Sequence, residues 1–251
     1  MIFSRRRKQE QPPDARAPAG SLVYAIGDLH GRSDLLDDML GQIVKDAEGR
    51  AADRRVLVYL GDYVDRGHDS RGVIDRILAG PPDGFEQACL LGNHEAWMLD
   101  FLADARAGAG WLANGGGQTL ASYGVAGGVG ARSLERLEDV RAAFAEALPS
   151  AHRAFYEGLS LLWRESDYVF VHAGVRPGVA FADQDPADLL WIREEFLYSD
   201  ADFGAVVVHG HTIDDMPVVR ANRIGVDTGA FATGRLTCLC LEGGERRFLQ
   251  T

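Results

Sequence analysis

With 251 residues, of which 46% are hydrophobic and 25% charged, the chain is long enough for one large globular α/β domain with a substantial core. The formal net charge of -11 argues against non-specific binding to nucleic acid or to anionic membranes, because both favour a positive surface. The sequence lacks an apolar run of the roughly 18 residues needed to span a bilayer. Its three cysteines form no disulfide framework, so we expect a reducing, cytoplasmic setting.

The first twenty residues differ in composition from the rest of the chain. Residues 5–8 are basic, and a polar run rich in Pro and Ala follows without an apolar stretch, which excludes a secretory signal. We therefore expect residues 1–20 to form a disordered tail and residues 21–251 to form a single domain.

Five short apolar runs predict buried strands of a sheet. After several of these runs, apolar residues recur at the spacing of a helix, as in an α/β protein. Each run ends in a turn that contains polar side chains. The runs are residues 22–26, 56–60, 88–91, 168–171 and 205–208. Residues 223–226, 236–241 and 246–249 predict further strands, which we expect to be antiparallel to one another.

The pattern changes between residues 103 and 163. Glycine-rich stretches at 108–117 and 124–130 precede a helical pattern over 132–162, which Pro149 divides into two helices. The segment shows no independent core, so we interpret it as a helical insertion that flanks the site.

The turn after the second strand, Gly61 to Gly67, carries Asp62, Asp65 and Arg66. Open α/β sheets place their chemistry at the carboxyl ends of strands, where carboxylates bind cations and an arginine fork matches phosphate. The alternative for this heptad alone is a surface turn with one ion pair.

Metal-competent residues follow all five strands. Five of the seven histidines lie at these strand ends, and only His68 and His152 lie elsewhere. A structural role is the simpler explanation for any single histidine, but five coincident placements indicate a shared site. The strand-end residues are Asp28 and His30, Asp62, Asn93 and His94, His172, and His209 and His211.

The motifs G-D-x-H-G, G-D-x-V-D-R-G, G-N-H-E, H-A-G and G-H-T occur here in that order. Together they resemble the calcineurin-like metallophosphoesterases, and more closely the bacterial and bacteriophage-lambda-type phosphoprotein phosphatases. Residues 111–116 and 191–193 are also similar to segments of that short group. The resemblance implies a β-sandwich of two mixed sheets flanked by helices, with a two-metal site at the strand ends.

Carried over motif by motif, the resemblance implies a role for most strand-end residues. Asp28 and His30 would bind one metal ion, Asp62 would bridge two, and Asn93, His172 and His211 would complete the second. His209 has either a supporting role at the site or a purely structural one. Mixed Asp, His and Asn ligation is compatible with Mn, Fe or Zn, and the family's habit favours manganese. Asp227 we expect to be a structural turn former.

Such a site suits phosphoester hydrolysis. In such a site two cations would activate a water, Arg66 and Arg193 would neutralise the phosphoryl charge, and His94 would protonate the leaving oxygen with Asp65 as its partner. The alternative for Arg193 is a helix-surface ion pair with Glu194 or Glu195.

The resemblance therefore predicts a metal-dependent phosphomonoester hydrolase, in particular a serine/threonine protein phosphatase whose substrate is a phosphorylated protein. The competing enzyme function is hydrolysis of dinucleoside polyphosphates such as diadenosine tetraphosphate. Its adenine pocket would have to come from residues 97–163, which offer Trp111, Tyr123 and Phe144 as aromatic candidates. A catalytically inactive metal-binding module is a third hypothesis, but neither a ligand nor the His94–Asp65 pair has been lost.

Overall fold

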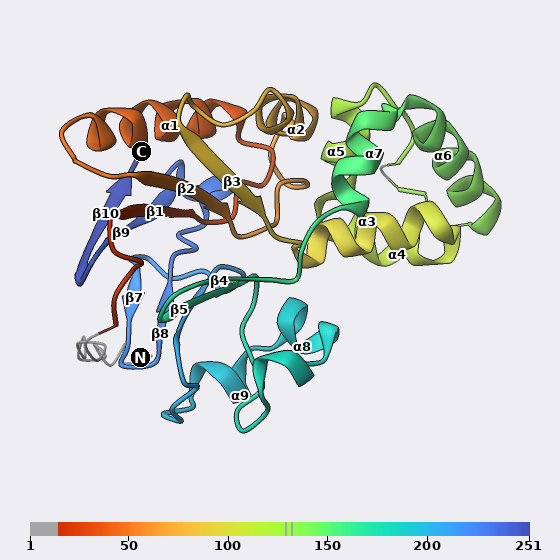
Figure 1. The fold of residues 1–251 in the computed structure, drawn as a ribbon. Coiled ribbons are helices and arrows are strands. Elements are labelled where there is room, and N and C mark those ends of the chain that lie inside the picture. The colour runs from red at the N-terminus through yellow and green to blue at the C-terminus, as the bar shows by residue number, and fades with distance from the viewer. Residues whose placement is uncertain (1–14, 129, 132) are drawn as a thin grey trace, which may run out of the picture.

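The computed structural model describes residues 15–128, 130–131 and 133–251. Two five-stranded sheets lie face to face, with helices on the outer side of each, and a cluster of helices projects from one end (Figure 1). The strand orders are β10-β9-β1-β2-β3 and β4-β5-β6-β8-β7. This is the two-sheet α/β architecture that the sequence predicts.

The first sheet contains the chain's first three strands and its last two. The strands β1, β2 and β3 are parallel, β9 is antiparallel to β1, and the edge strand β10 is antiparallel to β9. The bounds are Ser21–Ile26, Arg54–Tyr59 and Phe85–Cys89 for β1 to β3, and Thr237–Glu242 and Glu245–Gln250 for β9 and β10.

The second sheet is mixed as well. The strands β5, β6 and β8 are parallel, with β4 and β7 antiparallel at the two edges. The bounds are Leu162–Glu165 for β4, Tyr168–Val171 for β5, Val206–His209 for β6, Val218–Val219 for β7 and Arg223–Gly225 for β8.

The period-two alternation of β1 explains why this strand can lie in the middle of the molecule. Its residues Leu22, Tyr24 and Ile26 belong to the apolar cluster beneath the helices, whereas Val23 and Ala25 belong to the cluster between the two sheets. Both faces of β1 are therefore buried, which favours a nearly continuous apolar strand.

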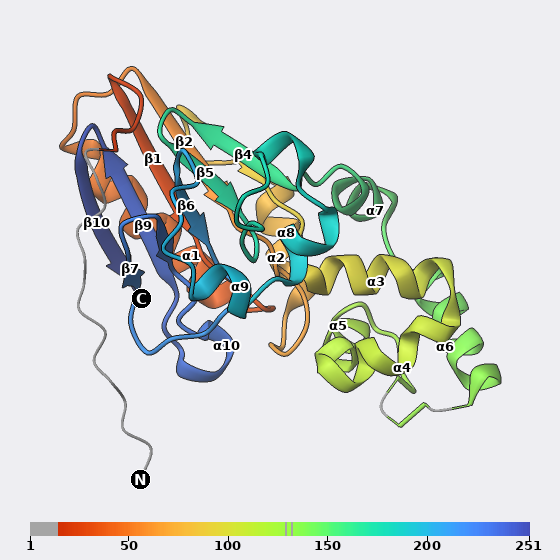
Figure 2. The ribbon, with the colours of Figure 1, turned by 90° about the horizontal axis from the view of Figure 1, so that it is seen from below.

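Helices cover the outer faces of both sheets. α1 and α2 lie over the first sheet, and α8 and α9 lie outside the second, as Figures 1 and 2 show from two directions. Their bounds are Ser33–Glu48, Ser70–Leu78, Pro186–Trp191 and Glu194–Leu197. A short helix, α10, spans Ala230–Thr233. No helix among the described residues is long and apolar enough to cross a bilayer.

The remaining helices form the cluster at one end of the sandwich (Figure 1). Their apolar side chains continue the cluster beneath α1 and α2, so the insertion shares the core of the domain. The helices are α3 Asn93–Ala103, α4 Gly108–Trp111, α5 Gly117–Ser122, α6 Leu134–Ala147 and α7 Ser150–Glu157. A π-helical segment, Leu112–Gly116, joins α4 to α5, and a 3₁₀ turn, Ala105–Ala107, joins α3 to α4.

Three sequence-based expectations differ from the structure. The helical pattern expected over 132–162 ends at Glu157, and Leu162 already begins the strand β4, which pairs with β5. The expected strand at 223–226 lies in the second sheet, parallel to β6, and not beside the two C-terminal strands.

The third difference concerns the tail. Most of the expected tail lies outside the described residues, but residues 15–20 pack on the sandwich. Ala15 and Ala17 are buried, and the Ala17 N–H donates to the Gly243 carbonyl at 2.8 Å. The packed chain thus includes residues that the composition assigns to the tail, because alanine can be buried without a long apolar run.

Candidate active site

The turns at the strand ends have unusual backbone conformations. Among the described residues, six that are not glycine have positive φ, and five of these six are site residues predicted from the sequence. Such conformations are costly for residues with a Cβ and persist where the surroundings hold them. The five are His30, Asp62, Asp65, Arg66 and His211.

Glu95 holds the turn after β2 in place. Its buried carboxylate accepts the backbone N–H groups of Asp62, Tyr63 and Val64 at 2.8–3.1 Å, and that of Gly92 at 3.1 Å. One side chain on α3 thus satisfies four donors from two strand-end turns. Glu95 ends the G-N-H-E motif, but the sequence predicts no role for it, because its partners are backbone groups.

Asp62 lies between two groups of possible metal ligands. One group is His30, Asp62 and His94, and the other is Asp62, His172 and His211; the ligand atoms in each group lie within 4.8 Å of one another. All of these residues are buried. Asp62 Oδ2 lies 3.5 Å from His30 Nε2, and Asp62 Oδ1 lies 3.4 Å from His172 Nε2.

Backbone hydrogen bonds set the orientation of two of these imidazoles. His30 donates from Nδ1 to the Val64 carbonyl at 2.8 Å, and His172 donates from Nδ1 to the Leu60 carbonyl at 2.9 Å. In each ring the other nitrogen, Nε2, is left without a proton and faces Asp62. This arrangement is typical of histidines that bind metals.

Asn93 brings the second group together. Its Oδ1 lies 2.8 Å from His172 Nε2 and 2.9 Å from His211 Nδ1. His211 Nε2 is buried without a hydrogen-bond partner. An amide oxygen and two imidazole nitrogens that converge in this way fit a divalent cation.

The protonation states also fit metal binding. Burial lowers the pKa of His30 to about 3 and that of His211 to about 2, so both rings are neutral, as a metal requires. Burial alone would raise the pKa of Asp62, but charge interactions with His172 and then His94 outweigh it and lower that pKa.

Asp28 lies beside these groups but is not a member of either. Its buried carboxylate accepts the His211 backbone N–H at 3.0 Å. Burial first, and then Asp227 and Asp62, raises the pKa of Asp28. A Cβ on Gly210 would come within 2.0 Å of Asp28 Oδ1, so only glycine permits this approach of the chain.

Asp227 is closer to the site than the sequence analysis expected. It caps its own turn by accepting the Gly229 N–H at 2.9 Å, as expected of a turn former. Burial raises the pKa of Asp227 to about 6, with Asp62 contributing in the same direction.

His94 and Asp65 form a buried pair. His94 donates from Nδ1 to Asp65 Oδ2 at 2.7 Å, and its Nε2 lies 3.9 Å from Asp62 Oδ2. Burial would lower the pKa of His94, but Asp62 and Asp65 outweigh it and raise that pKa.

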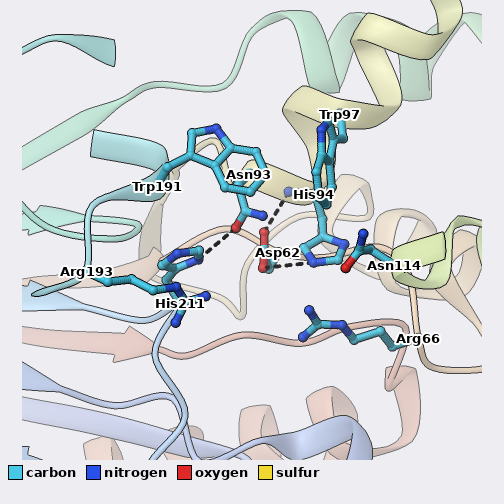
Figure 3. Close-up of a pocket in the computed structure, with 9 residues that line it drawn as sticks. All are labelled: Asp62, Arg66, Asn93, His94, Trp97, Asn114, Trp191, Arg193 and His211. Carbon is cyan, nitrogen blue, oxygen red and sulfur yellow. Dashed lines mark hydrogen bonds and ion pairs between the residues drawn. The ribbon is translucent and has the colours of Figure 1, made fainter. Parts of the chain in front are cut away.

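A pocket of about 90 Å³ opens over Asp62 (Figure 3). The two arginines lie on opposite sides of Asp62 in this view, and two tryptophans form one wall. The lining residues are Asp62, Arg66, Asn93, His94, Trp97, Asn114, Trp191, Arg193 and His211.

The two arginines are held in different ways. Arg66 Nη1 lies 2.9 Å from His30 Nε2, and its guanidinium lies 4.8 Å from the centre of the Phe231 ring. Arg193 donates to Thr212 Oγ1 at 3.2 Å and lines the pocket.

The aromatic wall differs from the one the sequence suggests. Trp111 and Phe144 are fully buried, and Tyr123 is 4% exposed, so none of the three lines the pocket. Its aromatic residues are Trp97 and Trp191, whose ring centroids lie 4.7 Å apart. Helical periodicity explains the error, because Trp97 reads as a residue of the apolar stripe of α3.

His209 does not belong to either ligand group. Its ring meets Phe196 edge-on at 5.0 Å between centroids, and its Nδ1 donates to the Gly210 carbonyl at 3.0 Å. These contacts match the structural alternative for this residue.

Comparisons with known proteins agree with this geometry. The model of the calcineurin-like phosphoesterase family matches residues 21–215. "Serine/threonine-protein phosphatase 1" of Salmonella typhimurium is 29% identical over 220 residues, which covers 86% of this chain and 89% of the relative.

Two solved structures share the fold. One is described as a putative diadenosine tetraphosphatase, with a TM-score of 0.62, 20% identity, and coverage of 94% of this chain and 98% of that one. A cold-active protein tyrosine phosphatase has a TM-score of 0.57, 18% identity, and coverage of 96% and 81%.

The fold and the site therefore define a phosphoesterase. The chain belongs to the calcineurin-like phosphoesterase family. Within that family it is a phosphoric monoester hydrolase.

Proposed function

We propose that the protein is a serine/threonine protein phosphatase that uses two divalent metal ions, with manganese as the native metal. The observation that carries the proposal is Asp62, shared by two buried ligand groups beneath a pocket that also holds two arginines and the His94–Asp65 pair. The Salmonella relative supports the choice of substrate.

In this proposal each metal ion takes its ligands from several strand ends. Asp28, His30 and Asp62 hold the first ion. The second is held by the shared Asp62 together with Asn93, His172 and His211. When bound, the ions lower the pKa of a water molecule and neutralise phosphate oxygens.

The chain's own residues supply the remaining chemistry. Arg66 and Arg193 bind the phosphoryl oxygens from opposite sides of the pocket, which stabilises the charge of the transition state. His94 gives its Nε2 proton to the leaving oxygen as the phosphorus–oxygen bond breaks. Asp65 accepts the Nδ1–H of the same ring and balances its charge.

One feature favours the alternative substrate, a dinucleoside polyphosphate. Trp97 and Trp191 form an aromatic wall at the pocket, and such a wall can stack a nucleobase. The structural neighbour described as a diadenosine tetraphosphatase points the same way.

A direct comparison of substrates tests the proposal. Purified protein with added manganese would be given a phosphoserine peptide and diadenosine tetraphosphate in parallel. We expect the peptide to be turned over with the larger kcat/KM. Dominant hydrolysis of the dinucleotide would overturn the proposed substrate in favour of the alternative.

The setting of the enzyme is part of the proposal. We propose a cytoplasmic protein without a nucleic-acid partner, on the grounds of its three free cysteines and its net charge of -11.

A further inference from the structure

The carboxylate of Asp65 has more partners than His94. Trp111 Nε1 donates to Asp65 Oδ2 at 2.8 Å, the same oxygen that receives the His94 Nδ1 proton. Thr119 Oγ1 donates to Asp65 Oδ1 at 2.6 Å. All four side chains are buried, so no hydrogen bond of this carboxylate is exchanged for one with bulk water.

Both additional donors come from the helical insertion. Trp111 ends α4 and Thr119 lies in α5, whereas Asp65 lies in the turn after β2 and His94 in the first turn of α3, which follows β3. The insertion is therefore connected to the His94–Asp65 pair by two side-chain hydrogen bonds to the Asp65 carboxylate. Neither Trp111 nor Thr119 lines the pocket.

The indole of Trp111 packs against two aromatic rings. Its ring lies 5.1 Å from that of Phe101 and 5.8 Å from that of Phe144, centroid to centroid. A Cβ on Gly116 would come within 2.5 Å of the indole, so the backbone also closes over it. Close packing on a fully buried ring disfavours other rotamers, so the N–H donates in a fixed direction.

Thr119 is fixed by a second set of contacts. While its hydroxyl donates to the Asp65 carboxylate, the same oxygen accepts the Asp65 backbone N–H at 2.9 Å. It also lies 3.1 Å from Ser70 Oγ. Thr119 thus forms hydrogen bonds with both the backbone and the side chain of Asp65, whose φ is +73°.

We propose that Trp111 and Thr119 are positioning residues for proton transfer, an inference that rests on the proposed role of His94. Their hydrogen bonds fix the plane of the Asp65 carboxylate, and this carboxylate fixes the ring of His94 with Nε2 toward the leaving oxygen. The helical insertion is then part of the catalytic machinery, and not only a flank of the pocket.

The chemistry gives the proposal a specific signature. Water attacks phosphorus, the bond to the leaving oxygen breaks with its electron pair on that oxygen, and the His94 proton neutralises the charge. A basic alkoxide or phenolate needs that proton, whereas p-nitrophenolate is a stable anion and leaves without it. A misaligned His94 therefore slows basic leaving groups selectively.

The test uses the full-length, manganese-loaded protein and conservative variants. Trp111→Phe keeps an aromatic ring next to Phe101 and Phe144 and removes the N–H donor together with the pyrrole part of the indole, while Thr119→Val replaces the hydroxyl with a methyl group. Trp163→Phe is the matched control, since Trp163 Nε1 donates to Glu165 Oε1 at 2.9 Å in β4, outside the pocket.

We expect Trp111→Phe and Thr119→Val to lower kcat for phenyl phosphate and for a phosphoserine peptide by about 10-fold or more. For p-nitrophenyl phosphate kcat should change by less than about twofold, with KM and the bound manganese unchanged. Combined with His94→Asn, neither change should slow the enzyme further, because both act through His94. Trp163→Phe should behave as wild type.

Equal losses on both aryl phosphates, or a loss of bound manganese, would assign Trp111 and Thr119 a merely structural role and overturn the inference. The proposed function fails separately, if wild-type protein hydrolyses the aryl phosphates but not the peptide. In that case the inference about Trp111 and Thr119 is still tested by the ratio of kcat for phenyl phosphate to kcat for p-nitrophenyl phosphate.

Discussion

Two opposing effects act on His94. Burial in a low-dielectric site disfavours its charged form, whereas Asp62 and Asp65 favour it, and the two carboxylates prevail, so the pKa of His94 is raised. An acid must hold its proton before it can donate it. The raised pKa thus extends the pH range in which His94 can protonate a leaving group.

Asp65→Asn tests this balance. The substitution removes a negative charge 2.7 Å from Nδ1 and so lowers the pKa of His94. Because the protonated ring is the active form, activity is lost as pH rises through that pKa, and the alkaline limb of the kcat profile should move to lower pH. We also expect kcat to fall by about 100-fold. An unchanged limb, measured with a phosphopeptide, would show that another group titrates there.

Most of the residues proposed for the site could be picked out from the sequence, because each follows the end of a strand in a recognisable motif. Asn93, His172 and His211 do converge, at 2.8–2.9 Å. Glu95 and Trp97 were not identified as site residues. The partners of Glu95 are backbone N–H groups, which leave no mark in a sequence, and an aromatic residue on a helix reads equally well as core.

Among the elements, the π-helical segment that joins α4 to α5 is in direct contact with Arg66, a predicted substrate-binding residue. The Gly115 carbonyl accepts the Arg66 N–H at 3.2 Å, and Gly115 has a φ of +111°. A Cβ at this position would lie 2.7 Å from Arg66 N and 2.8 Å from Arg66 Cγ. This close approach requires glycine.

Gly115→Ala should therefore displace Arg66. We expect kcat/KM for a phosphopeptide to fall by about 10-fold or more, with a loss of stability of about 1–3 kcal/mol from the strained backbone. Gly110→Ala is the matched control, because a Cβ there meets nothing within 4 Å and the residue has no positive φ. Parallel kinetics and thermal unfolding separate the two effects. If Gly115→Ala and Gly110→Ala were equally active, the close approach of Gly115 to Arg66 would not matter for activity.

The elements that were correctly predicted are those with strong internal patterns. The strand β5 is a continuous apolar run that is buried throughout, and α1 has a clear apolar stripe. The strand β4 was missed because three of its four residues are not fully buried and one is an arginine. It forms because the edge of β5 is available to pair with it, which the local sequence does not reveal.

At the scale of the whole molecule, the site joins the two sheets. Asp62 and Asn93 follow strands of the first sheet, and His172 and His211 follow strands of the second. His172 also donates across the interface to the Leu60 carbonyl. Local patterns do not show which strands share a sheet, and the strand β8 was accordingly placed with the wrong partners.

Metal binding should therefore stabilise the whole sandwich. At a concentration 100 times Kd, a ligand that binds only the folded state adds about 2.7 kcal/mol per site, or roughly 5–10 °C in Tm for a domain of this size. We expect manganese to raise Tm by about that much for each ion bound and chelation to reverse the rise.

Two histidine variants locate this effect. His172→Asn should lose much of the manganese-dependent rise in Tm, because it removes a ligand contributed by the second sheet. His152→Asn, in the insertion, should keep the rise even if its own Tm is lower, since His152 pairs with Asp75 and Tyr123, away from the ligand groups. An identical rise in the two variants would argue against metal ligation by His172.

The central claim is that Asp62 is shared by two metal ions that hydrolysis requires. Its most direct test is the manganese content per chain, measured together with phosphatase activity, in wild-type protein and in Asp62→Asn. We predict two ions per chain in the wild type, and in the variant loss of bound metal together with at least about a 100-fold loss of kcat. An Asp62→Asn protein that retains two ions and full activity would contradict the account.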